Sequence, residues 1–237
     1  MMRAERFLPW ALLAAVVPAV LIFTVASGEQ PQQPPSGPHD ATIHHSFKGI
    51  DQWVRAFDDP KRDLWQKPQE TVAAMRITPG MTVADLGAGT GYFNRYLAGA
   101  VGPGGMVLAL DTEIEMVQHM AERNRREGLS NVLPVLVAPE DPFFPRRRVD
   151  RVLIVDTYHH IDDRLNYFAH MRGALTARGS IVVIDYLKKP VPVGPGAEHK
   201  IDRDLVVREM KQIGLNLARE ETFLPYQYFL VFEPARR

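Results

Sequence analysis

A glycine-rich segment restricts the folds that this chain can adopt. Residues 83–91 read VADLGAGTG, in which an apolar strand meets an acidic residue and three alternating glycines. Residues 92–100 follow directly and have a helical pattern. Glycine lets a ligand approach the backbone, and a helix start offers free N–H groups. A strand, a glycine turn and a helix in this order therefore predict a ligand-binding α/β unit.

The acid before the glycines favours one class of ligand. Dinucleotide-binding loops read G-x-G-x-x-G and hold a pyrophosphate at the helix N-terminus, whereas this loop reads D-x-G-x-G-x-G. A carboxylate here would repel a pyrophosphate and would suit an ammonium group. The segment resembles motif I of the class I S-adenosylmethionine (SAM) methyltransferases, in which the loop packs against the methionine part of SAM. The resemblance implies cofactor contacts for Asp85, Gly87, Ala88, Gly89 and Gly91.

A second acid follows the next apolar strand. Residues 106–110 form that predicted strand, and Asp111 comes directly after it. In nucleotide-binding α/β folds, a carboxylate about 20 residues beyond the glycine loop accepts hydrogen bonds from ribose hydroxyls. SAM carries such a ribose, so Asp111 and its neighbour Thr112 are candidate cofactor residues. Either side chain could instead cap the helix predicted from Glu113.

The alternation of strands and helices continues along the chain. It predicts an α/β, three-layer Rossmann-like fold, and the resemblance adds the class I sheet order 3-2-1-4-5-7-6 with strand 7 antiparallel. Pro134 cannot donate to a sheet ladder, which agrees with an edge position for the third strand. The further predicted strands span residues 132–137, 150–155, 180–184, 215–222 and 226–232. The helix after the fourth strand is expected to turn Leu165, Phe168 and Leu175 toward the core, and Arg123, Arg125 and Arg126 are expected to form a solvated helix face.

The first 43 residues differ in composition from the rest. Arg3 and Arg6 precede an uncharged apolar run over residues 7–26, which is typical of a targeting segment. Residues 1–27 are therefore a predicted signal peptide or N-terminal membrane anchor, and both readings make the protein exported (periplasmic or secreted) or membrane-attached. Residues 28–43 are rich in Pro and Gln and predict a disordered linker. A methyltransferase domain would then span residues 44–237.

The composition excludes several other kinds of function. The chain has 237 residues, 46% of them hydrophobic, a formal net charge of +0 and no cysteine. A neutral charge gives no indication of a nucleic-acid partner. The lack of cysteine excludes disulfides, thiolate metal sites and a cysteine nucleophile.

Chemistry is expected after the fourth strand. Ligands of open parallel sheets lie beyond the C-terminal ends of the strands, where the strand order reverses. Residues 156–160 follow the fourth strand, so Asp156 should face the cofactor. His159 and His160 are the candidate catalytic bases, because imidazole titrates near neutral pH.

Other residues are candidates for the adenine and acceptor pockets. Family members commonly bind the adenine amino group with an acid after the third strand, which implies Asp141 first and Glu140 second. Trp65 lies in a polar segment that could be part of a lid or could only pack its helix down. Tyr158 and Tyr186, which follow the fourth and fifth strands, are candidate acceptor-pocket residues.

A metal is not expected. The catechol-type O-methyltransferases hold a divalent cation with acids after strands four and five, and Asp156 and Asp185 occupy similar positions. The Asp-Asn pair that those enzymes have after strand five is missing, because the chain reads Asp185-Tyr186 here.

Together these features predict a SAM-dependent methyltransferase that acts on a small-molecule acceptor, with a layout similar to the quinone-biosynthesis C-methyltransferases. Two alternatives stay open. One is an NAD(P)-dependent oxidoreductase, against which Asp85 argues. The other is a non-catalytic SAM-binding protein of the same fold, since a fold does not determine its reaction.

Overall fold

The computed structural model describes residues 49–142 and 146–235, which belong to one compact unit. The predicted leader and linker over residues 1–43 lie outside the described residues. Among the described helices, none is long and apolar enough to cross a membrane.

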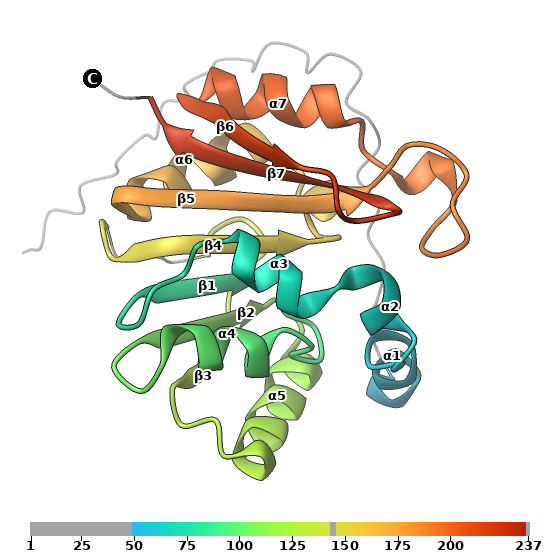
Figure 1. Ribbon diagram of the computed structural model, residues 1–237, viewed down its shortest axis with the longest axis vertical. Coiled ribbons are helices and arrows are strands. Elements are labelled where there is room, and N and C mark those ends of the chain that lie inside the picture. Colours follow the sequence, from blue (N-terminus) through green and yellow to red (C-terminus); the bar gives the residue numbers. More distant parts are fainter. Residues whose placement is uncertain (1–48, 143–145, 236–237) are drawn as a thin grey trace, which may run out of the picture. The chain divides into compact units, whose positions relative to one another are not determined.

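A mixed seven-stranded sheet forms the centre of this unit, in the order β3-β2-β1-β4-β5-β7-β6 (Figure 1). The first five strands pair in parallel, whereas β7 is antiparallel to β5 and β6. The predicted order is confirmed, including the edge position of Pro134 in β3. The strands are β1 (Thr82–Leu86), β2 (Met106–Asp111), β3 (Val132–Leu136), β4 (Val149–Val155), β5 (Leu175–Tyr186), β6 (Leu215–Glu221) and β7 (Gln227–Pro234).

Within the described residues, seven α-helices and two short 3-10 turns connect and cover the strands. Proline sets one of their boundaries, because Pro68 occupies the first turn of α3, where its missing N–H is tolerated. The helices are α1 (Ile50–Phe57), α2 (Arg62–Gln66), α3 (Pro68–Ala74), α4 (Asn94–Val101), α5 (Ile114–Glu127), α6 (Arg164–Ala174) and α7 (Arg203–Gln212), with the 3-10 turns η1 (Tyr158–His160) and η2 (Ala197–His199).

Two hydrophobic cores lie on the two faces of the sheet. Successive strand residues point to opposite faces, so Leu153 packs with α3 and α4, whereas Val152 and Ile154 pack with α6 and α7. Figure 1 shows α3 and α4 in front of the sheet and α6 behind it. Both faces are therefore covered, as expected for a mainly parallel sheet.

Two predicted details of the fold were wrong. Strand β5 begins at Leu175 and not at residue 180, because Leu175 already pairs with Val149 before a bulge in the ladder. Leu165, which was expected to face the core, is 38% exposed. The buried stripe of α6 instead contains Tyr167, Phe168 and Met171, one step round the helix.

Candidate cofactor and acceptor site

The site residues meet at one edge of the sheet. Strands β1 and β4 are parallel neighbours at the point where the strand order reverses. Their C-terminal ends carry the glycine loop after β1 and residues 156–160 after β4. Figure 1 shows α1 and α2 beside this edge, together with the loop that follows β5.

The glycines of the loop adopt backbone angles that only glycine adopts readily. Gly87, Gly89 and Gly91 have φ angles of +70°, +57° and +79°. A Cβ at Gly87 would lie 2.3 Å from Oγ1 of Thr157, the second residue after β4. The loop therefore packs directly against the segment that was expected to hold the chemistry, and a side chain at Gly87 would separate the two.

Asp111 fastens the loop to the end of β2. Its Oδ2 accepts the N–H of Gly89 at 2.8 Å, and its Oδ1 accepts the N–H of Glu113 at 3.0 Å. Burial raises the pKa of Asp111, and these two backbone donors oppose the rise. A carboxylate oxygen accepts more than one hydrogen bond, so Asp111 supports the helix start and can still bind ribose hydroxyls. Thr112 is exposed beside it.

Asp85 is a buried acid at the end of β1, only 3% exposed. Burial raises its pKa to about 7, while the Arg62 guanidinium lowers it and Asp111 adds to the rise. A nearby cation stabilises the ionised form of such a buried carboxyl group, so this position favours a cationic ligand. The close-approach loop, Asp85 and Asp111 thus fit the three parts of SAM that the sequence assigned to them: the methionine backbone, its ammonium group and the ribose.

The two candidate adenine acids, Glu140 and Asp141, differ in their surroundings. Glu140 is exposed, whereas Asp141 is half-buried and lines a cavity of about 490 Å³ beside α6, together with Arg146 and His170. Asp141 also faces Tyr167 on α6, where its charge adds to the burial that raises the pKa of that phenol. Their role at the adenine stays a prediction.

At the end of β4, Asp156 is held in a strained turn. Its φ of +53° is unusual for a residue with a side chain, and its N–H donates to the Ile184 carbonyl at 2.9 Å. Both of its carboxylate oxygens accept from Nε2 of Gln227, at 2.8 and 3.0 Å. Backbone strain of this kind costs about 1–3 kcal/mol and often marks functional sites.

The structure separates the two candidate bases. Nδ1 of His159 lies 2.8 Å from Oδ2 of Asp185, and both side chains are buried. Burial alone would lower the pKa of His159, but the Asp185 hydrogen bond and the charges of Asp185 and Asp156 outweigh it and raise the pKa. The His160 ring lies 4.2 Å from that of His159 and is more exposed.

Asp185 as the partner of His159 was missed from the sequence, where it was considered only as a metal ligand. The position of the two residues at the C-terminal ends of neighbouring strands was the signal that could have found the pair. Across the described residues there is no group of three or more His, Cys, Asp or Glu side chains that could hold a metal ion.

The prediction that Tyr158 lines the acceptor pocket was wrong. Its side chain is fully buried, it stacks on Phe168 with ring centroids 4.7 Å apart, and its hydroxyl donates to Glu209 at 2.8 Å. The turn η1 directs this ring into the core beneath α6 and α7, where it stabilises the fold.

The other two acceptor candidates do come together. The ring of Trp65 from α2 lies 6.0 Å from that of Tyr186 and 6.4 Å from that of Tyr226. The loop after β5 reaches the same place, because a Cβ at Gly194 would lie 2.4 Å from the Tyr186 ring. Three aromatic rings from three segments therefore gather beside the end of β5.

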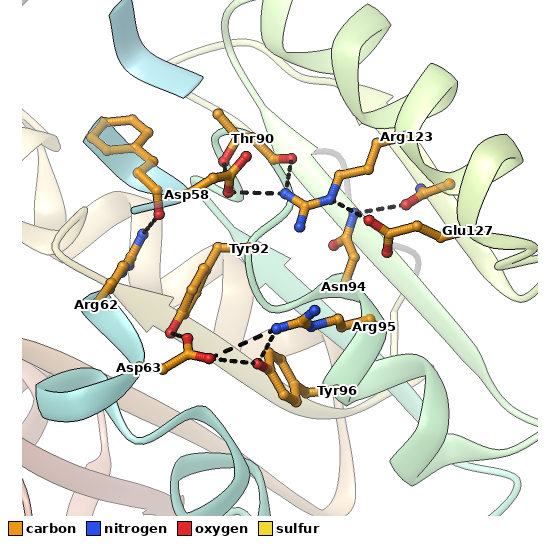
Figure 2. A network of polar contacts seen from close by, with 12 residues as sticks. Asp58, Arg62, Asp63, Thr90, Tyr92, Asn94, Arg95, Tyr96, Arg123 and Glu127 are labelled. Atoms are coloured by element: carbon orange, nitrogen blue, oxygen red, sulfur yellow. Dashed lines mark hydrogen bonds and ion pairs between the residues drawn. The ribbon is translucent and has the colours of Figure 1, made fainter. Parts of the chain in front are cut away.

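A polar network joins α1 and α2 to the glycine loop and to α5, and Figure 2 shows it. We call residues 50–66 the N-terminal cover. Asp58 accepts hydrogen bonds from Thr90 in the loop and from Arg123 in α5, both at 2.9 Å. Asp63 accepts the hydroxyl of Tyr92 at 2.5 Å. Arg123 was expected to be solvated, and that expectation was wrong, since it also donates to the Thr90 carbonyl.

The comparisons with known proteins agree with this geometry. Residues 83–179 match the family model described as a methyltransferase domain. The ubiquinone/menaquinone biosynthesis C-methyltransferase UbiE of Bordetella avium is 29% identical over 126 residues, 53% of this chain and 48% of that one. The glycine/sarcosine/dimethylglycine N-methyltransferase of Actinopolyspora halophila is 30% identical over 62% of this chain and 26% of its own length.

In structure, a SAM-dependent methyltransferase from Aquifex aeolicus is similar, with a TM-score of 0.74 and 24% identity over 78% of this chain and 97% of that one. The sheet order and the site define a class I methyltransferase fold. The chain resembles a methyltransferase domain over residues 83–179 and has the fold of the class I SAM-dependent methyltransferases. It spans less than two thirds of the length of either sequence relative.

Replacing Gly87 by alanine should damage both the loop and cofactor binding. The left-handed backbone costs about 1–2 kcal/mol for a residue with a Cβ, and the contact with Thr157 adds to this. We expect Gly87→Ala to lower the unfolding free energy by at least that amount and to weaken SAM binding about tenfold or more. Urea unfolding and calorimetric titration measure the two effects.

The matched control is Gly99→Ala in α4, where a new Cβ meets nothing within 4 Å. That change should stabilise the protein by about 0.5–1 kcal/mol and leave SAM binding unchanged. Equal effects of the two substitutions would contradict the tight packing of the loop. NADH binding in the same titration would favour the oxidoreductase alternative.

Proposed function

We propose that this protein transfers the methyl group of SAM to a small-molecule acceptor and that His159 acts as the base. The observation that carries the proposal is the buried His159–Asp185 pair, 2.8 Å apart, beside the glycine loop. SAM supplies an electrophilic methyl group on a sulfonium. The protein's part is to hold the acceptor in line with it and to remove a proton from the acceptor.

The pair is arranged as a base and its positioning residue. Asp185 accepts the Nδ1–H of His159, which leaves Nε2 of the neutral ring as the proton acceptor. Oδ1 of Asp185 accepts the Tyr186 N–H at 2.8 Å, so the carboxylate is itself fixed. Such an imidazole suits an acceptor that arrives with its O–H, N–H or acidic C–H bond intact.

The aromatic rings favour a planar acceptor. Trp65, Tyr186 and Tyr226 lie together beside the end of β5, the strand that also carries Asp185, and aromatic side chains pair favourably with other flat rings. The match to a quinone-biosynthesis C-methyltransferase supports the same class. The match to a glycine N-methyltransferase supports an amine instead, so a panel of both classes is the appropriate test.

We predict that His159→Gln retains SAM binding but loses methyl transfer by about 10²–10⁴-fold, the usual contribution of general base catalysis. The assay uses radiolabelled SAM with a panel of hydroquinones, phenols and amines. His160→Gln is the comparison, because it changes the adjacent residue and leaves the Asp185 pair intact. A larger loss for His160→Gln would transfer the role of base to His160. SAM binding by the wild type without transfer to any acceptor class would favour the non-catalytic alternative.

Asp185→Asn should move the pH dependence of the transfer. Asp185 raises the pKa of His159, and the neutral imidazole is the active form, so activity rises with pH through that pKa. Removing the carboxylate should shift the acidic limb downward by about one pH unit. The other charged groups facing His159, Asp156 and Arg164, stay in place. An unchanged acidic limb would argue that another group titrates.

We also propose that residues 1–27 direct the protein out of the cytoplasm or attach it to the membrane, on the strength of the basic residues before the apolar run. Fusing residues 1–43 to a phosphatase that requires disulfides should give an active enzyme, because disulfides form outside the cytoplasm. A fusion without residues 7–26 is the control. Equal inactivity of both fusions would place the domain on the cytoplasmic side.

A further inference from the structure

Two glutamines lie fully buried where the N-terminal cover meets the sheet. Gln66 at the end of α2 is 0% exposed, and Gln227 at the start of β7 is 2% exposed. Nε2 of Gln66 donates to Oε1 of Gln227 at 2.8 Å, although the residues are 161 positions apart in sequence. A buried amide is costly unless its oxygen and nitrogen both find partners, so the other ends of these amides are informative.

These hydrogen bonds form a relay that runs from Arg62 through Gln66 and Gln227 to Asp156. The two ends of the relay fix the direction of its hydrogen bonds. At one end Gln227 donates from Nε2 to both oxygens of Asp156. At the other end Oε1 of Gln66 accepts from Nε and Nη2 of Arg62, at 3.3 and 3.2 Å. A carboxylate only accepts and a guanidinium only donates. Both amides must therefore point their N–H groups toward Asp156 and their oxygens toward Arg62.

The charges around Asp156 explain why its carboxylate needs the hydrogen bonds of this relay. Loss of solvation and the nearby Asp185 raise the pKa of Asp156 to about 7, while Arg62, Gln227 and His159 act in the opposite direction. Tyr186 lies near Asp156, whose charge adds to the burial that raises the pKa of the Tyr186 phenol. Without the donors, the carboxyl group would be protonated at neutral pH.

We propose that Gln66 and Gln227 are positioning residues that favour the ionised form of Asp156 beside the transferred methyl group, and that they thereby favour the substrate SAM over the product S-adenosylhomocysteine (SAH). The inference rests on the SAM-binding site described above. Two further observations support it. Asp156 is adjacent to Thr157, which contacts the glycine loop at Gly87, and the Arg62 guanidinium faces Asp85 as well as Asp156.

The discrimination follows from charge. SAM carries a positive sulfonium, whereas SAH has a neutral thioether, and the two molecules share the ammonium, carboxylate and ribose. An anionic Asp156 attracts the positively charged sulfur of SAM but not the neutral sulfur of SAH. Asp85 and Asp111 face the parts that the two molecules share, so their contributions cancel when the two affinities are divided. The ratio of the SAM and SAH affinities therefore reports on the charge next to the sulfur.

The experiment titrates SAM and SAH by calorimetry from roughly pH 5 to 9 into wild type, Gln227→Met and Gln66→Met. Methionine is as long as glutamine and makes no strong hydrogen bond. In the wild type, the SAM preference should fall as pH falls through the pKa of Asp156. In Gln227→Met the midpoint should move up by about one to two pH units, the effect of losing a hydrogen bond to a charged group.

Gln66→Met should shift the midpoint in the same direction by a smaller amount, since it breaks the hydrogen-bond relay one step further from Asp156. Gln69→Met is the matched control, because Gln69 is exposed on α3, and it should behave as the wild type. Repeating the titration in a His159→Gln background removes the imidazole that also faces Asp156. In Asp156→Asn the pH dependence of the ratio should vanish.

A ratio in Gln227→Met that matches the wild type at every pH would overturn the proposal. Failure of the wild type to bind either molecule would instead overturn the cofactor assignment. The relay would then still be tested by carbon NMR of the aspartate carboxyl groups, with Asp156 assigned by difference from Asp156→Asn. In that measurement an unmoved Asp156 titration in both methionine variants would overturn it.

Discussion

Buried negative charge at the C-terminal edge of the sheet is the constraint on which the rest of the site depends. Asp85 and Asp185 are almost completely buried. The charge of Asp185 also acts on Asp156, whose pKa it helps to raise. Carboxylates in such surroundings are unstable without donors or cations. His159 compensates Asp185, and the relay from Arg62 compensates Asp156. The N-terminal cover therefore supplies charge and hydrogen bonds to the site as well as lying beside it.

The first helix of the cover is tied to the rest of the protein by polar contacts. Helix α1 has no buried residue, and the ties to the body include Asp58 with Arg123 and Asp63 with Tyr92 (Figure 2). Partly exposed ion pairs of this kind are each worth about 1 kcal/mol or less, whereas releasing a packed helix would cost far more. The position of Arg62, which faces both Asp85 and Asp156, therefore depends on a segment whose first helix buries no residue.

The sequence predicted the features that depend on local pattern. The glycine loop and the acid at Asp111 follow from spacing, and the layered fold follows from the alternation of strands and helices. The strand order was expected from the resemblance to a known family. The direction of Tyr158 was missed, because a 3-10 turn after β4 rotates the ring into the core. The pairs Gln66–Gln227 and Asp58–Arg123 join residues 161 and 65 positions apart. No local pattern encodes such pairs, since they exist only after the chain has folded.

The charge of the site is balanced near neutral pH, and this affects how any cation binds there. The pKa values of Asp85 and Asp156 are both raised to about 7, so part of the unliganded population carries a proton on each carboxyl group. A cationic ligand binds the ionised forms, so its binding must release protons. In the proposed site, lower pH would therefore weaken the binding of SAM through both acids, but that of SAH through Asp85 alone. A small change in the surroundings thus changes the balance between substrate and product without any change in the contacts that the two share.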